Sequence, residues 1–139
     1  MKRRTFLILS FTWGIILSFL GCIAYVILTI AGFKPQRYNN CLYFEVGEDW
    51  GGLELGWVFI VNKNPSTHIL NHELGHGYQN CYYGIFFTLI FIWSFLRYHY
   101  RNIVKKINPE KKLKPYDSIW FEGQATALGE KMVKRGKSI

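Results

Sequence analysis

Two long apolar runs set the hydrophobic pattern of this chain. The first covers residues 5–32 and is almost uninterrupted after the basic residues Lys2, Arg3 and Arg4. As a helix it would be about 42 Å long, more than the roughly 30 Å hydrocarbon core of a bilayer. We therefore expect residues 1–32 to form an N-terminal transmembrane helix, with a cleaved signal peptide as the competing interpretation.

The second apolar run, residues 82–96, is at the lower limit of the length that crosses a bilayer. It could be re-entrant, interfacial or buried against the first run. A full crossing would put its flanking segments on opposite sides of the membrane. We expect partial insertion, although the basic residues after Leu96 are typical of a cytoplasmic loop.

Between the two runs, the pattern predicts a small sheet. Residues 33–40 form a polar linker, and residues 41–46 and 53–61 have the character of two strands around a Gly-rich turn. The strand just before the next helix could be an edge strand, along which an extended peptide could pair its backbone.

Residues 72–76, His-Glu-Leu-Gly-His, form an H-E-x-x-H motif. On a helix, residues four apart lie on the same face, so His72 and His76 can bind one metal ion. Glu73 lies about 60° around the helix axis from His76, where it can address a water without being a ligand. The motif predicts a zinc site with Glu73 as general base.

The residues around the motif favour a helix. Asn64 can cap it and Pro65 suits its first position. Apolar residues recur at every fourth position on the face away from the histidines: Leu70, Leu74, Tyr78 and Tyr82.

A last helix is expected to begin near Asp117 or Ser118 and to end before Gly136. One of its faces carries a carboxylate beside small residues: Glu122, Ala125 and Gly129. Such a face permits close approach of another element.

A catalytic zinc usually has three protein ligands and one open position. Residues 122–126, Glu-Gly-Gln-Ala-Thr, resemble the E-x-x-A-D motif that follows H-E-x-x-H in gluzincin metallopeptidases, particularly the membrane-associated ones related to CAAX-processing proteases. Tyr82 stands where metzincins place a third histidine. The resemblance implies that Glu122 is the third ligand, with Asp117 as the alternative. Thr126 departs from the family, which has a supporting aspartate there.

Two further residues are candidates for roles near the metal. His68 lies one turn before His72 and extends the histidine stripe, so it could be a surface residue, support a ligand or stabilise a transition state. Tyr116 could donate to an oxyanion.

The formal charge of +8 is unevenly spread, with seven basic residues and one acid in residues 97–114. Because aromatic residues lie beside these Arg and Lys side chains, an anionic membrane surface suits this charge better than nucleic acid. The basic N-terminus predicts that this end lies in the cytoplasm. Cys41 and Cys81 could form a disulfide or stay as buried thiols.

We therefore expect an α+β protein with residues 1–32 as membrane anchor and residues 33–139 as a zincin-like domain. This domain would combine a β-hairpin or small sheet, the H-E-x-x-H helix, an apolar membrane-associated helix and a C-terminal ligand helix. The predicted function is a membrane-anchored peptidase with one zinc per chain and a peptide substrate. The alternatives are a non-catalytic scaffold that keeps the zinc-binding fold and a membrane protein with coincidental histidines.

Overall fold

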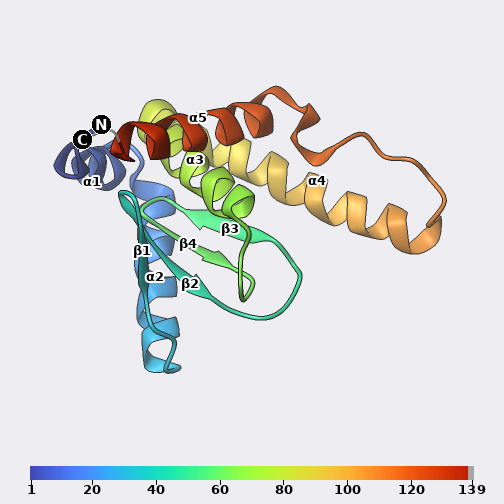
Figure 1. Cartoon of the computed structure of the whole chain (residues 1–139), viewed down its shortest axis with the longest axis horizontal. Coiled ribbons are helices and arrows are strands. Elements are labelled where there is room, and N and C mark those ends of the chain that lie inside the picture. Colours follow the sequence, from blue (N-terminus) through green and yellow to red (C-terminus); the bar gives the residue numbers. More distant parts are fainter. Residues whose placement is uncertain (138–139) are drawn as a thin grey trace.

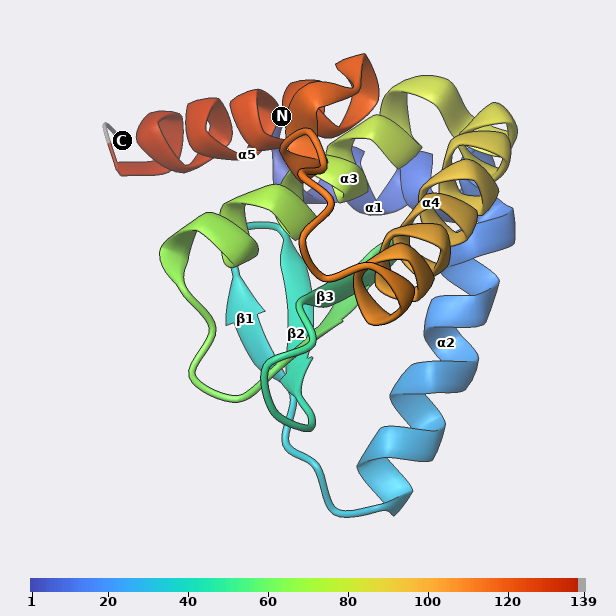
Figure 2. The same cartoon turned by 90° about the vertical axis from the view of Figure 1, so that its right-hand side faces the viewer.

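In the computed structural model, which describes residues 1–137, helices pack on both faces of a small sheet (Figures 1 and 2). The helices are α1 (Arg3–Thr12), α2 (Ile15–Ile30), α3 (Thr67–Tyr83), α4 (Phe87–Ile107) and α5 (Trp120–Lys137), with 3₁₀ turns η1 (Gly84–Phe86) and η2 (Tyr116–Ser118). The strands are β1 (Gln36–Tyr38), β2 (Cys41–Glu45), β3 (Gly52–Leu55) and β4 (Val58–Val61). The expected α+β class is confirmed.

The sheet is mixed, with the strand order β1-β2-β4-β3. Strands β2 and β4 are parallel, whereas β1–β2 and β3–β4 are antiparallel. The single strand expected over residues 53–61 is wrong, because the chain reverses at Gly56, which has a φ of 80°. Consequently β3 is an edge strand, and β4 is central. Strand β4 directly precedes α3, the metal-motif helix, which carries the H-E-x-x-H motif. Strand β1 lies within the expected linker, residues 33–40.

Strand residues alternate between the two helix-covered faces of the sheet. The face toward α3 carries Tyr43 and Phe59, which pack with Leu74 of that helix. The opposite face carries Phe44 and Val58, which pack near residues of α2. The sheet is therefore the middle layer between α2 and α3.

Residues 1–32 do not form the single helix expected from their composition. Helices α1 and α2 meet at a bend of 102°. Gly14 lies at this bend, and Asn80 of α3 donates a hydrogen bond to its carbonyl at 3.2 Å. A Cβ on Gly14 would lie 2.3 Å from Asn80 Nδ2, so only glycine allows this contact. In addition, Phe6 of α1 is fully buried against Tyr78. The N-terminal segment is thus packed against the metal-motif helix.

The second apolar run is part of a longer helical segment. Residues 67–107, comprising α3, η1 and α4, are apolar enough to cross a membrane by length and composition. Within this segment α3 is mostly buried by protein, whereas Phe87 is the one buried residue of α4. Helix α4 extends away from the sheet, as Figure 1 shows.

Cys41 and Cys81 are both buried and free. Burial raises the pKa of each thiol. They therefore behave as packing residues between β2 and α3.

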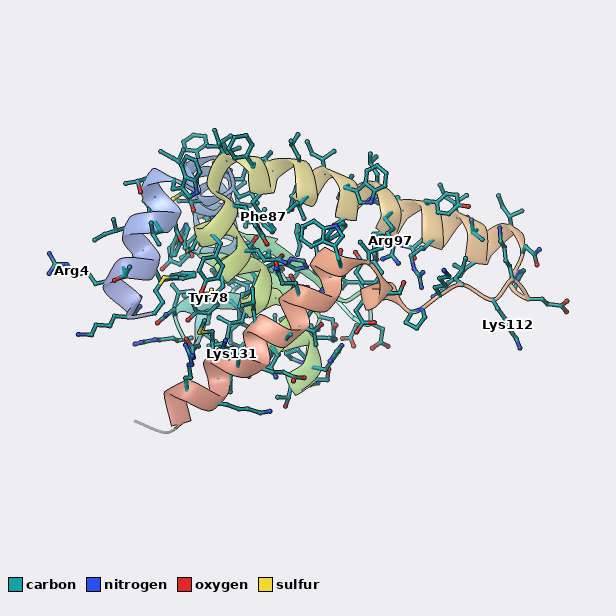
Figure 3. All side chains as sticks on the ribbon, turned by 90° about the horizontal axis from the view of Figure 1, so that it is seen from above. Arg4, Tyr78, Phe87, Arg97, Lys112 and Lys131 are labelled. Atoms are coloured by element: carbon teal, nitrogen blue, oxygen red, sulfur yellow. The ribbon has the colours of Figure 1, made fainter. Side chains whose placement is uncertain are left out.

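Helices α3 and α5 lie side by side and touch through their backbones (Figure 3). A Cβ on Gly75 would lie 1.8 Å from the Ala125 carbonyl oxygen, and one on Gly129 would lie 1.7 Å from that of Asn71. The small face expected on the last helix therefore packs directly on the motif helix. Helix α5 begins at Trp120, slightly later than expected, and the expected end before Gly136 is wrong, because the helix continues to Lys137.

Replacing Gly129 by alanine should destabilise the protein. Helix propensity alone would favour alanine by about 1 kcal/mol, but the clash with the Asn71 carbonyl should lower the free energy of unfolding by roughly 1–3 kcal/mol. Gly136→Ala on the same helix is the control, because the nearest atom there is a side-chain nitrogen at 3.3 Å. Chemical denaturation of both variants in detergent checks this. Equal stability of the two variants would contradict the proposed packing constraint.

Candidate metal centre

The motif helix α3 is fixed at both ends. Ser66 caps it, with Oγ accepting from the Ile69 amide at 3.2 Å. Asn64, the expected cap, lies two residues earlier with a φ of 51°. At the other end, Trp13 packs on Gly84 and donates to the Tyr82 carbonyl. The histidines lie on the side of α3 that faces α5.

The structure brings His72, His76 and Glu122 together from two helices. The Nε2 atoms of the two histidines are 3.1 Å apart, and each lies 3.1 Å from Oε2 of Glu122. Ligand atoms of a tetrahedral zinc at about 2.0–2.1 Å would be roughly 3.3 Å apart. The triangle of atoms therefore has the size that a zinc ion requires.

The hydrogen bonds behind this triangle orient both imidazoles. Gln79 donates through Nε2 to the Phe121 carbonyl, so its Oε1 accepts from His76 Nδ1 at 2.8 Å. Likewise Thr126 donates to the Glu122 carbonyl and accepts from His72 Nδ1 at 3.0 Å.

In the neutral imidazoles, both Nε2 lone pairs consequently point at the carboxylate. While both rings are neutral, these lone pairs and the carboxylate are three acceptors at one point, and a bound cation would relieve the repulsion among them. Without a cation, protons on Nε2 would relieve it, and each ring would then donate to Glu122.

Glu122 is fully buried, and Ser94 of α4 donates to its Oε1 at 2.5 Å. Burial alone would raise the pKa of this carboxyl, but hydrogen bonds from His72, His76 and Ser94 outweigh it and lower the pKa. Glu122 is therefore a carboxylate, the form in which it can bind a metal.

No other group of three or more metal-binding side chains converges within residues 1–137. Comparison of the chain with protein-family models, with curated proteins and with solved structures finds no match.

A cavity of about 530 Å³ adjoins His72 and His76, between the edge strand β3 and helix α4. Asp117, the alternative ligand, lines this cavity but does not belong to the converging group. His68 also lines it, exposed to solvent, and its ring stacks on that of His72 at 6.3 Å between centroids.

Glu73 lies in the same cavity, 6% exposed. Gly52 of β3 lies so close that a Cβ there would be 2.5 Å from its Oε1. Burial raises the pKa of Glu73 to about 7, with the neighbouring His72 opposing and the Glu122 charge adding to the shift. This proton affinity suits a general base near neutral pH.

Tyr116 is held against the cavity by two arginines of α4. The guanidinium of Arg97 lies over its ring at 4.9 Å from the centroid, and that of Arg101 at 5.7 Å. Arg97 also donates to the Tyr116 carbonyl, and Figure 3 shows it pointing toward the start of α5. Burial, followed by the charges of Glu122 and Glu73, raises the pKa of the Tyr116 phenol. Tyr116 therefore stays protonated and can donate a hydrogen bond.

Three residues around the centre were not found from the sequence: Ser94, Gln79 and Glu54. Ser94 lies in an apolar run, and nothing in the sequence around it indicates that its hydroxyl contacts Glu122. Gln79 does have a signal, since it lies one turn after His76 on the same helix. Glu54 lies close to a Gly-rich turn, where an acidic residue is usually exposed. Side chains alternate between the two faces of a strand, however, so Glu54 between Leu53 and Leu55 could equally point inward.

Replacing Ser94 by alanine should weaken zinc binding by about 10–100-fold, as expected when a hydrogen bond that orients a ligand is removed. Asn102→Ala, an exposed polar position on the same helix, is the control. Competition of each variant with a chromophoric zinc chelator measures the affinity. Unchanged affinity in Ser94→Ala would show that Ser94 does not orient Glu122.

Proposed function

We propose that this protein is a membrane-associated, zinc-dependent peptidase. The observation that supports it best is the convergence of His72, His76 and Glu122 at 3.1 Å, beside a cavity that both histidines line together with Glu73. A binding site for zinc alone would not need the buried carboxyl of Glu73 beside it. The combination is that of a metal hydrolase.

Zinc bound by the three ligands would supply a Lewis acid that activates water and polarises a carbonyl oxygen. Glu73 accepts the proton of the attacking water and transfers it to the leaving amine. Tyr116 donates a hydrogen bond to the oxyanion that forms at the scissile carbonyl. Its two arginine contacts hold the phenol in place for this role.

The edge strand β3 supports a peptide as substrate. Its outer side has no partner strand within residues 1–137, and residues 51–54 line the cavity. An extended peptide can pair its backbone with such an edge and so place its scissile bond beside Glu73.

The distribution of exposed apolar residues supports membrane association. Large exposed apolar residues lie on α1, α2, η1 and α4, with Tyr82 and Trp120 beside them. On α4 they follow one face, which includes Leu89, Trp93, Leu96, Tyr100, Ile103 and Ile107. The opposite face of α4 lines the cavity. An apolar surface of this extent on a monomer favours a lipid or protein partner.

The course of the chain after α4 favours partial insertion over a full crossing. Residues 108–115 return along α4, as Figures 1 and 2 show, and Arg101 donates to the Lys114 carbonyl at 2.7 Å. This return segment is rich in lysine, which would be costly inside the hydrocarbon. The charged tip at Lys112 (Figure 3) suits the anionic headgroup region. The cytoplasmic position of the N-terminus stays a prediction.

Peptide hydrolysis by the full chain tests the proposal. Wild type in detergent should cleave members of a mixed peptide library, and Glu73→Gln should lower the rate by at least about 100-fold while one zinc per chain remains bound. Mass spectrometry of the products and metal analysis measure the two quantities. Zinc without hydrolysis in wild type would instead support the non-catalytic scaffold.

Replacing Leu89, Trp93 and Leu96 by serine should reduce recovery of the protein with lipid vesicles, because these side chains contribute apolar area to the proposed lipid-facing surface. The control replaces the exposed polar residues Glu48, Lys63 and Thr67 by serine.

Flotation after detergent removal, with phosphatidylcholine vesicles with and without phosphatidylglycerol, compares the two variants. Phosphatidylglycerol should increase the recovery of wild type at low salt. Equal recovery of both triple variants would argue against α4 as a lipid-contacting helix.

A further inference from the structure

Glu54 is a buried carboxyl that the proposed chemistry does not use. It is 4% exposed, and neither of its oxygens has a hydrogen-bond partner among residues 1–137. In the register of the sheet it pairs with Phe59, which faces α3. Its side chain therefore lies on the side of β3 that faces the metal-motif helix.

Glu54 also lines the cavity at the metal centre. Gly52, two residues earlier on the same face of β3, contacts the Glu73 carboxylate. The unpartnered carboxyl of Glu54 is thus the next cavity-facing position along the edge strand after the contact with the general base.

Three acids and four histidines line the cavity, but none of its described lining residues is a lysine or arginine, although the chain has a net charge of +8. The nearest arginines, Arg97 and Arg101, stack on Tyr116 and donate to backbone carbonyls. No lysine or arginine of the described cavity wall is therefore available to Glu54, and no histidine there is hydrogen-bonded to it.

The remaining walls suit a long aliphatic side chain. Aromatic rings from the loop before β3 and from α4 line the cavity: Trp50, Phe91, Phe95 and Tyr98. Tyr98 donates to the Trp50 carbonyl at 3.2 Å, which joins the two walls. The methylene stem of lysine or arginine packs well on such rings while its charged end seeks a carboxylate.

We propose that this cavity selects peptide substrates by a lysine or arginine side chain whose cation pairs with Glu54. The inference rests on the proposed peptidase function and names its specificity. A buried carboxyl without a partner is unfavourable, and a substrate cation removes that penalty only when the correct side chain is present. Substrates that lack the cation leave Glu54 unpaired and bind more weakly.

The electrostatics of Glu54 agree with this role. Burial and then the charge of Glu73 raise the pKa of its carboxyl well above the ordinary value, and the Gly56 amide offsets this only in part without reaching hydrogen-bonding geometry. An uncompensated carboxyl in an apolar wall behaves in this way. A neighbouring ammonium or guanidinium group would reverse the shift.

Binding to the Glu73→Gln variant tests the inference without turnover. The probes are fluorescent peptides that differ only in lysine against norleucine at one position, which is moved along the peptide one residue at a time. At one position lysine should bind at least about tenfold more tightly than norleucine. Adding Glu54→Gln should reduce this ratio to near one, whereas adding Asp117→Asn should preserve it.

The possible results distinguish the cation subsite from the peptidase function. Lysine-selective binding that depends on Glu54, without hydrolysis by wild type, supports the cation subsite and contradicts the peptidase. Hydrolysis without any lysine preference overturns the subsite and leaves the peptidase standing, and absence of peptide binding also overturns the subsite. A preference lost in Asp117→Asn but kept in Glu54→Gln assigns the wrong carboxyl and overturns the role of Glu54.

Thermal unfolding provides the folding control for this experiment. Glu54→Gln should be at least as stable as wild type at neutral pH, because it removes the ionisation of a buried, unpaired carboxyl. A large loss of stability would mean that Glu54 has a structural partner, which contradicts its assignment as an unpaired subsite residue.

Discussion

Direct backbone contact between helices α3 and α5 is the constraint on which the candidate metal centre depends. Gly75 and Gly129 have no side chains, so each helix approaches a carbonyl of the other more closely than any larger residue would permit. This approach brings a carboxylate from α5 within 3.1 Å of two imidazoles on α3. A larger side chain at either glycine would push the helices apart toward the ordinary spacing of 8–10 Å and move Glu122 away from the histidines.

The second consequence of this contact is electrostatic, because it places groups that repel one another close together. When both imidazoles are neutral, they and the buried carboxylate present three acceptors to one point, and Ser94, Thr126 and Gln79 satisfy their other atoms. A cation at that point would complete the cluster, so metal binding and the packing of α3 on α5 should stabilise each other. Thr126 stands where the gluzincin motif has aspartate, and its hydroxyl accepts the His72 hydrogen bond in that place.

Local patterns predicted the parts of the structure that depend on local physics. The spacing of His72 and His76 and the small residues beside Glu122 follow directly from helix periodicity, and both appear as expected. Long-range packing decided the rest. The bend at Gly14 depends on Asn80, which lies on another helix, and composition alone favoured one straight span. The strand expected over residues 53–61 is divided because Gly56 packs against Ser18 of α2, a contact that no local pattern contains. Ser94 and Glu54 gave no clear signal for the same reason, since the roles of both side chains depend on residues that are distant in the sequence.

Zinc content is the most direct test of the central proposal. Wild-type protein purified in detergent under metal-replete conditions would be measured beside His72→Ala, His76→Ala and Glu122→Ala, with Asp117→Asn as a control from the cavity wall. We expect one zinc per chain in wild type and in the control, and loss of that zinc in the three alanine variants. Wild type without zinc would contradict the metal centre and the peptidase proposal together, and zinc retained in Glu122→Ala would contradict the proposed set of ligands.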